Sequence, residues 1–130
     1  PCPASPANVE RAAASHLAGR ACEDRAAEFL EAQGLRLLWR NYRCRAGELD
    51  IVGELGGLLL VVEVRMRSSQ RYGGAAASIT RAKRLRIVRA TRHLLACHRE
   101  LQRRPVRFDA VLVSGPSGAI EWLKAAFDAA

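Results

Sequence analysis

The stretch GELDIVGELGGLLLVVEVR, residues 47–65, predicts a β-hairpin and decides the fold. Its first half, residues 48–55, alternates polar and apolar side chains, as expected of a strand with one buried face. Gly56-Gly57 is a typical two-residue hairpin turn. The second half, residues 58–66, opens with an uninterrupted apolar run, which is typical of a central strand covered on both faces.

The turn also fixes which residues lie opposite one another. With Gly56 and Gly57 at the turn, Asp50 faces Glu63 and Glu48 faces Arg65, and all four side chains lie on one face of the sheet. A bulge of one residue would move the two acids apart. The register therefore predicts a pair of opposed carboxylates.

Opposed carboxylates, with Cβ atoms about 4.5–5.5 Å apart, repel each other. A shared proton, the neighbouring Arg65 or a divalent cation could offset this repulsion. Hard cations such as Mg²⁺ prefer oxygen ligands, including one or two carboxylates. The alternative is a cross-strand charge network that is formed by Asp50, Glu63, Arg65 and Glu48.

The rest of the chain supplies helices and strands on both sides of this hairpin. Gly34 ends a first helix, Pro105 ends a second, and Ser78 or Thr80 can cap the start of the second. The expected order is helix 6–33, strands 35–44, 48–55 and 58–66, a polar loop 67–77, helix 80–102, strand 106–113, a short edge strand 120–123 and a last helical turn 124–130. This order predicts an α/β fold with a mixed central sheet and helices on both faces, in a single domain of residues 1–130 with its core at about 19–127.

Charge indicates a polyanionic partner. The net charge is +8 and the pI is about 10.4, and nearly all of the positive charge is arginine. Such a balance is typical of nucleic-acid binding, although basic surfaces also bind membranes. The cysteines form no C-x-x-C pair, which argues against a zinc ribbon. No apolar run reaches the roughly 18 residues of a membrane span, and no secretory signal is evident, so we expect a cytoplasmic protein without membrane association.

Two helical residues could join the acids. Glu23 lies on the apolar side of the first helix, where it is either a rim residue or part of the site. Lys83 lies at the edge of the apolar face of the second helix, from which it can reach toward the acids or extend to water. Further basic residues, Arg67, Arg71, Arg81 and Arg84, are candidates for binding the nucleic-acid backbone.

These residues together resemble a known family. Glu23, Arg40-Asn41, Gly47-Glu48-Leu49-Asp50, Val62-Glu63-Val64-Arg65 and Arg107-Phe108-Asp109 follow the order seen in the bacterial YraN-like family. The resemblance covers about residues 19–127. It implies the restriction-endonuclease-like, PD-(D/E)xK superfamily, a three-layer α/β/α sandwich with a helix-strand-strand-strand-helix-strand core, and similarity to Holliday-junction resolvases.

The resemblance also implies roles. Asp50 and Glu63 match the metal-binding acids, and Glu23 matches a helix acid that supports the site. Arg65 stands where the superfamily has lysine. Arginine can stabilise charge but cannot act as a base near neutral pH. Either the metal alone acidifies the water, or Lys83 substitutes from the second helix, or activity is weak or absent.

The leading hypothesis is therefore an endonuclease that uses Mg²⁺ or Mn²⁺ to hydrolyse DNA, with branched or junction DNA suggested by resemblance. Glu23, Asp50, Glu63, Arg65 and Lys83 are its catalytic candidates, with Glu48 in support. Junction-cutting enzymes often act as symmetric dimers, which allows a homodimer, although the sequence shows no clear dimer surface. The alternatives are a non-catalytic nucleic-acid-binding module that keeps the fold, and a protein that binds structured RNA.

Overall fold

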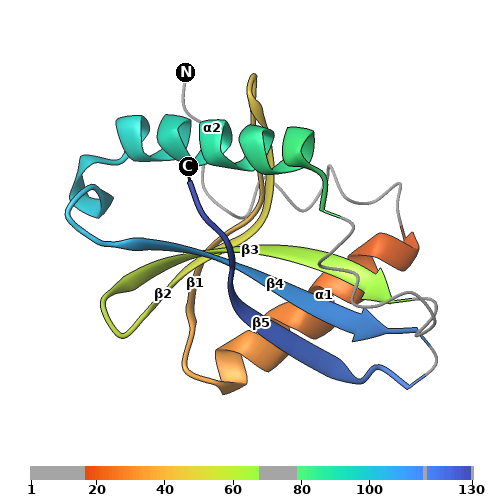
Figure 1. Ribbon diagram of the computed structural model, residues 1–130. Helices are drawn as coiled ribbons and strands as arrows, with labels where there is room; N and C mark the ends of the chain where they lie inside the picture. Colours follow the sequence, from red (N-terminus) through yellow and green to blue (C-terminus); the bar gives the residue numbers. More distant parts are fainter. Residues whose placement is uncertain (1–16, 68–78, 116, 130) are drawn as a thin grey trace.

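The computed structural model describes residues 17–67, 79–115 and 117–129. Two long helices, one short 3-10 helix and five strands follow one another along these residues (Figure 1). Their bounds are α1 Leu17–Ala32, β1 Arg36–Cys44, β2 Gly47–Leu55, β3 Leu58–Arg67, α2 Arg81–Cys97, the 3-10 helix η4 Arg99–Leu101, β4 Val106–Ser114 and β5 Ile120–Phe127.

The strands form one mixed sheet in the order β1-β2-β3-β4-β5. β3 and β4 run parallel, and the other neighbouring pairs are antiparallel. A parallel pair cannot be closed by a tight turn, and the crossover between β3 and β4 contains α2. The mixed sheet predicted from the order of elements is thus confirmed.

The two long helices lie on opposite faces of this sheet (Figure 1). Each face has its own apolar core: Ile87 and Leu94 of α2 pack in one cluster, whereas Ala26 and Leu30 of α1 pack in the other. The result is the predicted three-layer α/β/α arrangement, which is consistent with a restriction-endonuclease-like fold.

The hairpin has the register predicted from its turn. β2 and β3 pair from Leu55↔Leu58 to Ile51↔Val62. β3 lies at the centre of the sheet, and residues 59–63 are all buried. This confirms the expectation of a central strand covered on both faces.

Several boundaries differ from the sequence-based expectations. The first part of the predicted first helix and most of the predicted polar loop lie outside the described residues. Thr80 caps α2, because its side chain accepts a hydrogen bond from the Lys83 backbone N–H at 3.1 Å. α2 ends at Cys97, and the short η4 takes over the turn that the prediction had included in one long helix.

The expected last helical turn is wrong, because β5 continues to Phe127. Without β5, the edge of β4 would leave backbone N–H and C=O groups unpaired, and a neighbouring strand pairs them. The buried Asp109 carboxylate also accepts a hydrogen bond from the Ala125 backbone N–H at 2.9 Å. No helix among the described residues is long and apolar enough to cross a membrane.

Candidate functional site

The two hairpin strands separate where the predicted acids lie. The β2–β3 pairing ends at Ile51↔Val62. Before that point β2 pairs only with β1, and beyond it β3 pairs only with β4. The Val64 backbone N–H donates to Asp50 Oδ2 at 2.9 Å, so a carboxylate takes the place of a neighbouring strand. Asp50 and Glu63 therefore lie at a split in the sheet.

The two acids are in contact. The Glu63 side chain is 4% exposed and hydrogen-bonds to the side chain of Asp50. Burial raises the pKa of Asp50 well above its usual range, and the Glu63 charge, the hydrogen bond from Glu63 and the more distant Glu23 raise it further, whereas the Val64 N–H lowers it. The raised pKa of Asp50 favours a proton held between the two carboxyl groups, which is one of the three remedies expected for an opposed acid pair.

Two cations contact the same carboxylate. Lys83 Nζ on α2 lies 3.4 Å from Glu63 Oε2, and Arg65 Nη1 lies 3.8 Å from the same atom. Both cationic side chains are about one-third exposed, at 34% and 33%. Lys83 thus reaches toward the acids rather than extending only to water, and its partly exposed side chain lies between the acid pair and the surface.

The helix acid Glu23 approaches the pair from the other layer. Its pKa is raised mainly by burial, and its nearness is evident because its charge also raises the pKa of Asp50. Asn41 hydrogen-bonds to the Glu23 side chain and, with Arg40, partly offsets that rise. Glu23 Oε1 is buried and has no hydrogen-bond partner among the described residues. The split therefore brings together acids from α1, β2 and β3 and a lysine from α2.

Asn41 is a site residue to which the sequence analysis gave no role. It is 4% exposed and has a backbone φ of 53°, in the left-handed region that asparagine tolerates better than most residues. Trp39 and Tyr42 both face α2 although they are three residues apart, because the backbone turns between them. Asparagine is depleted in strands, so its presence within the predicted strand was the signal by which this residue could have been singled out.

The predicted support from Glu48 takes a different form. Glu48 pairs across β1 with Arg43, whose Nε lies 3.5 Å from Glu48 Oε2. The expected Glu48–Arg65 pairing is wrong because β2 and β3 have already separated at this level. Glu48 still lies near enough to Glu23 for its charge to raise that residue's pKa.

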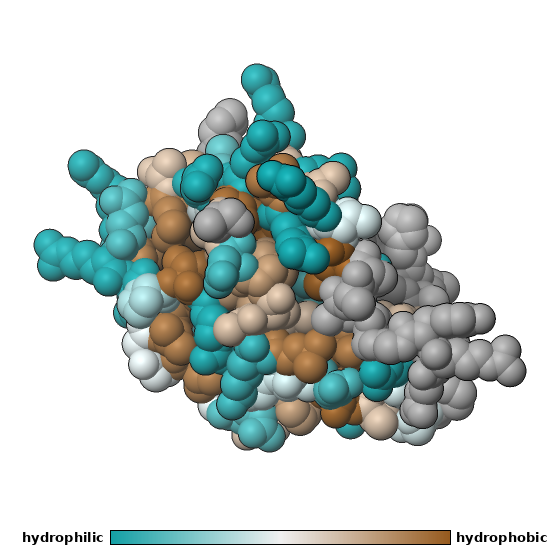
Figure 2. Space-filling model, viewed as in Figure 1, coloured by the Kyte–Doolittle hydropathy of each residue, from teal (hydrophilic) through white to brown (hydrophobic). Residues whose placement is uncertain are grey.

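The predicted phosphate-binding arginines do not share one environment. Arg67 is held by Glu121 of β5 at 3.0 Å and is largely covered, so it does not point outward as expected. Arg81 and Arg84 are exposed at the start of α2, with Arg84 Nε donating to the Ile79 carbonyl at 3.1 Å. Arg71 lies outside the described residues. Hydrophilic side chains project where α2 lies, with hydrophobic surface visible between them (Figure 2).

Asp109, a buried acid away from this site, holds β5 in place. Asp109 has no exposed surface and accepts two hydrogen bonds from Arg107, at 2.9 Å each, and one from Trp122 Nε1 at 2.8 Å. Its fourth donor is the Ala125 backbone N–H. Each carboxylate oxygen accepts two hydrogen bonds within the protein, so Asp109 is a structural residue that fixes β5 against β4.

The donor set at the split can be tested for a metal ion. Across residues 17–67, 79–115 and 117–129, no three His, Cys, Asp or Glu side chains are arranged as a metal-binding group. Asp50 and Glu63 nevertheless fit Mg²⁺, which commonly binds one or two carboxylates and completes its shell with water and substrate phosphate. The unpartnered Oε1 of Glu23 supplies a further buried acceptor nearby.

Comparison with known proteins assigns the chain to a family. The model of the uncharacterised protein family UPF0102 matches residues 22–113. The chain belongs to this family. A UPF0102 protein of Nitrosomonas europaea is 54% identical over 112 residues, which cover 85% of this chain and 92% of that protein. A relative from Paracidovorax citrulli is 52% identical over 97% of this chain and 93% of its own length, and one from Legionella pneumophila is 43% identical over 85% and 94%. UPF0102 is the YraN-like family identified above by resemblance.

Proposed function

We propose that this UPF0102 protein is a metal-dependent endonuclease that hydrolyses phosphodiester bonds in DNA, using Mg²⁺ or Mn²⁺. The observation that supports the proposal is the contact between Asp50 and Glu63 where β2 and β3 separate, with Lys83 at 3.4 Å from Glu63. A buried acid pair beside a lysine on a basic protein is suited to phosphodiester chemistry.

Each group has a distinct role in this proposal. Asp50 and Glu63 hold the cation, and Glu23 supports Asp50 from α1. The cation supplies Lewis-acid activation of water and neutralises charge on the phosphate. Lys83 and Arg65 face the phosphate oxygens and stabilise the charge that develops there. Because arginine stays protonated, Lys83 is the better candidate of the two for accepting a proton.

Affinity for the DNA backbone comes from the exposed arginines at the start of α2, Arg81 and Arg84. Contacts to phosphate hold the backbone without reading its sequence. We therefore propose a substrate chosen by its shape, with branched DNA as the first to test.

A second candidate is a nucleic-acid-binding module that does not cleave. It is favoured by the cavity at the acid pair, which is too small to hold a water molecule, and by the two cations that already contact Glu63. Both candidates predict binding to DNA, and they differ in whether the bound DNA is cut.

Cleavage of labelled branched and linear DNA with Mg²⁺, with Mn²⁺ and with EDTA distinguishes them. We expect metal-dependent cleavage that falls at least about 100-fold in Asp50→Asn and in Glu63→Gln, since loss of a metal ligand removes several kcal/mol of stabilisation. Glu54→Gln is the matched control, because Glu54 lies on β2 but pairs with Arg36 and Arg104 away from the site.

Binding without cleavage under all metal conditions would support the module. Cleavage that persists in Asp50→Asn would reject the site. A competition titration at fixed salt between branched DNA and structured RNA tests the remaining reading, because an RNA-binding protein must prefer the RNA.

A further inference from the structure

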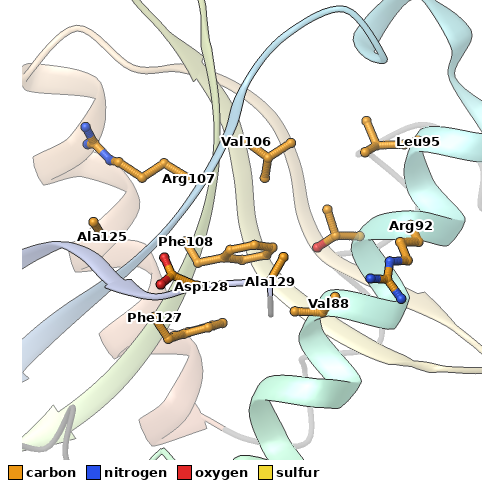
Figure 3. A pocket seen from close by; sticks show the side chains of 11 residues that line it. Val88, Arg92, Leu95, Val106, Arg107, Phe108, Ala125, Phe127, Asp128 and Ala129 are labelled. Carbon is orange, nitrogen blue, oxygen red and sulfur yellow. The ribbon is translucent and has the colours of Figure 1, made fainter.

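A hollow runs along α2 beneath the last described residues, on the other side of Phe127 from the acid pair. One part of it is a cavity of about 270 Å³ between α2, β4 and residues 127–129 (Figure 3). A second hollow of about 400 Å³ continues toward the start of α2 and shares Val88 and Phe127 with the first. We call the two together the α2 trough. The first hollow approaches, and the second lies within, the roughly 300–1,000 Å³ of ordinary ligand pockets.

The floor of the trough is apolar and aromatic. Phe108 and Phe127 stack with ring centroids 5.1 Å apart and ring planes 18° apart. Val88 and Leu95 of α2 face these rings across the cavity (Figure 3). The two rings are only 5% and 9% exposed, so they form an apolar floor against which part of a nucleobase can pack.

The rim of the trough is basic. Arg81 and Arg84 line the part near the start of α2, and Arg92 lines the part next to β4, all three exposed on α2. Arg107 contributes little, because its side chain turns away to Asp109 (Figure 3). Asp128 at the rim can accept a hydrogen bond from the amino group of a base. An aromatic floor below a row of arginines combines the two features that bind single-stranded nucleic acid.

The trough lies next to the proposed active site, with Phe127 between them. Phe127 lines both parts of the trough and also the small cavity at Asp50 and Glu63. Ile87, the neighbour of Val88 on α2, lines that small cavity as well. A DNA strand whose phosphate lies at the acids can therefore place its next nucleotides along α2.

We propose that the α2 trough binds unpaired nucleotides of a DNA strand adjacent to the phosphate that is cut. Bases inside a duplex are stacked and paired, so they cannot enter the trough. The substrate is then DNA with a single-stranded segment next to the cut, such as a flap, a fork or a junction with unpaired bases. The location of the cut rests on the proposed function, whereas binding in the trough does not.

Binding is measured without catalysis, by fluorescence anisotropy of labelled single-stranded and duplex DNA of about 12 nucleotides in EDTA. We expect the wild-type protein to bind the single strand more tightly. Arg92→Glu, at an exposed position, is expected to weaken single-strand binding roughly 10-fold through the loss of a phosphate contact and the added repulsion. Leu95→Trp, which fills the cavity, is expected to weaken single-strand binding more than duplex binding.

Arg89→Glu is the matched control, because Arg89 is exposed on the same helix and lines neither part of the trough. Circular dichroism verifies the fold of each variant. Equal losses in Arg92→Glu and Arg89→Glu would show only a general charge effect and would overturn the proposal, as would wild-type affinity in Leu95→Trp or preference for an RNA strand of the same sequence.

The two proposals fail in different ways. Asp50→Asn is expected to keep single-strand binding, so an inactive protein that still binds through the trough contradicts the nuclease and not the trough. Cleavage that is as fast on fully paired duplex as on a flap contradicts the trough and not the nuclease.

Discussion

Replacing Asp50 with asparagine is expected to stabilise the metal-free protein at pH 8. Asp50 is partly exposed and lies against the buried Glu63, and its pKa is raised well above its usual range by loss of hydration and by that neighbouring carboxylate. Asparagine keeps an oxygen that can accept the Val64 N–H, and its amide can donate to Glu63 without bringing a second charge. The variant therefore removes a repulsion and retains the hydrogen bonds.

The magnitude follows from the contact. Two unit charges about 4 Å apart repel by about 4 kcal/mol at an effective dielectric constant of about 20. A shared proton removes part of this repulsion, but holding that proton at pH 8 costs free energy. Asparagine needs no proton, so the variant avoids this cost. We expect a gain of about 1–3 kcal/mol, which for a chain of this size raises Tm by roughly 3–10 °C.

The difference in stability between the wild type and Asp50→Asn should change with pH in a defined direction. A group whose pKa is higher in the folded state stabilises the fold below its unfolded pKa, and this contribution is lost as the pH rises through the folded pKa. Wild-type protein should therefore lose stability relative to Asp50→Asn between about pH 4 and pH 8. At the acid end of this range the difference should nearly vanish.

Thermal unfolding in EDTA, followed by circular dichroism at several pH values, measures this difference. Asp24→Asn is the matched control, since Asp24 forms a half-exposed ion pair with Arg40 at 2.6 Å and should give no gain. An Asp50→Asn variant that is less stable than wild type at pH 8, or equally stabilised at all pH values, would refute the reasoning. Added Mg²⁺ should raise the Tm of the wild type by mass action and leave Asp50→Asn unchanged.

Three further predictions concern the scaffold. Asp109→Asn should destabilise the protein by about 3 kcal/mol in urea unfolding, because it leaves a partly buried arginine without its carboxylate. Gly53→Ala should cost about 1–3 kcal/mol in the same assay, since a Cβ would lie 2.7 Å from the Arg36 carbonyl, whereas Gly115→Ala meets nothing within 4 Å and should be neutral. Tyr42 is buried, which raises its pKa to about 12, so a spectroscopic titration of the variant without the other tyrosine should show no phenolate at pH 10.

The hairpin could be predicted because local rules determine it. The turn glycines, the alternation before them and the apolar run after them set the register, and the structure has that register from Leu55↔Leu58 to Ile51↔Val62. The order of helices and strands then left few ways to arrange a mixed sheet. Extending that register by one pair places Asp50 opposite Glu63, and their side chains are in contact although the backbone pairing ends one residue earlier.

The separation of the two strands could not be predicted in this way. The register rule assumes that pairing continues, which would have placed Glu48 opposite Arg65. Pairing instead stops at Ile51↔Val62, and beyond this point the Val64 N–H donates to the Asp50 side chain rather than to the β2 backbone. This side-chain contact is a tertiary feature that the register rule does not contain. The length of β5 was missed for the same reason, since Asp109 holds Ala125 from another strand.

The tight contact of the acid pair does not by itself oppose metal binding. In the metal-free protein a shared proton and the Lys83 ammonium offset two carboxylates, and a hydrogen-bonded pair leaves no space between its members. Asp50 and Glu63 would hold a divalent cation in place of the proton, and its two charges would match those that the proton and Lys83 supply together, so Lys83 would be available to contact the phosphate. On this argument metal affinity rises with pH, and the arginine on β3 does not need to replace the lysine of related nucleases, because a lysine already reaches the acids from α2.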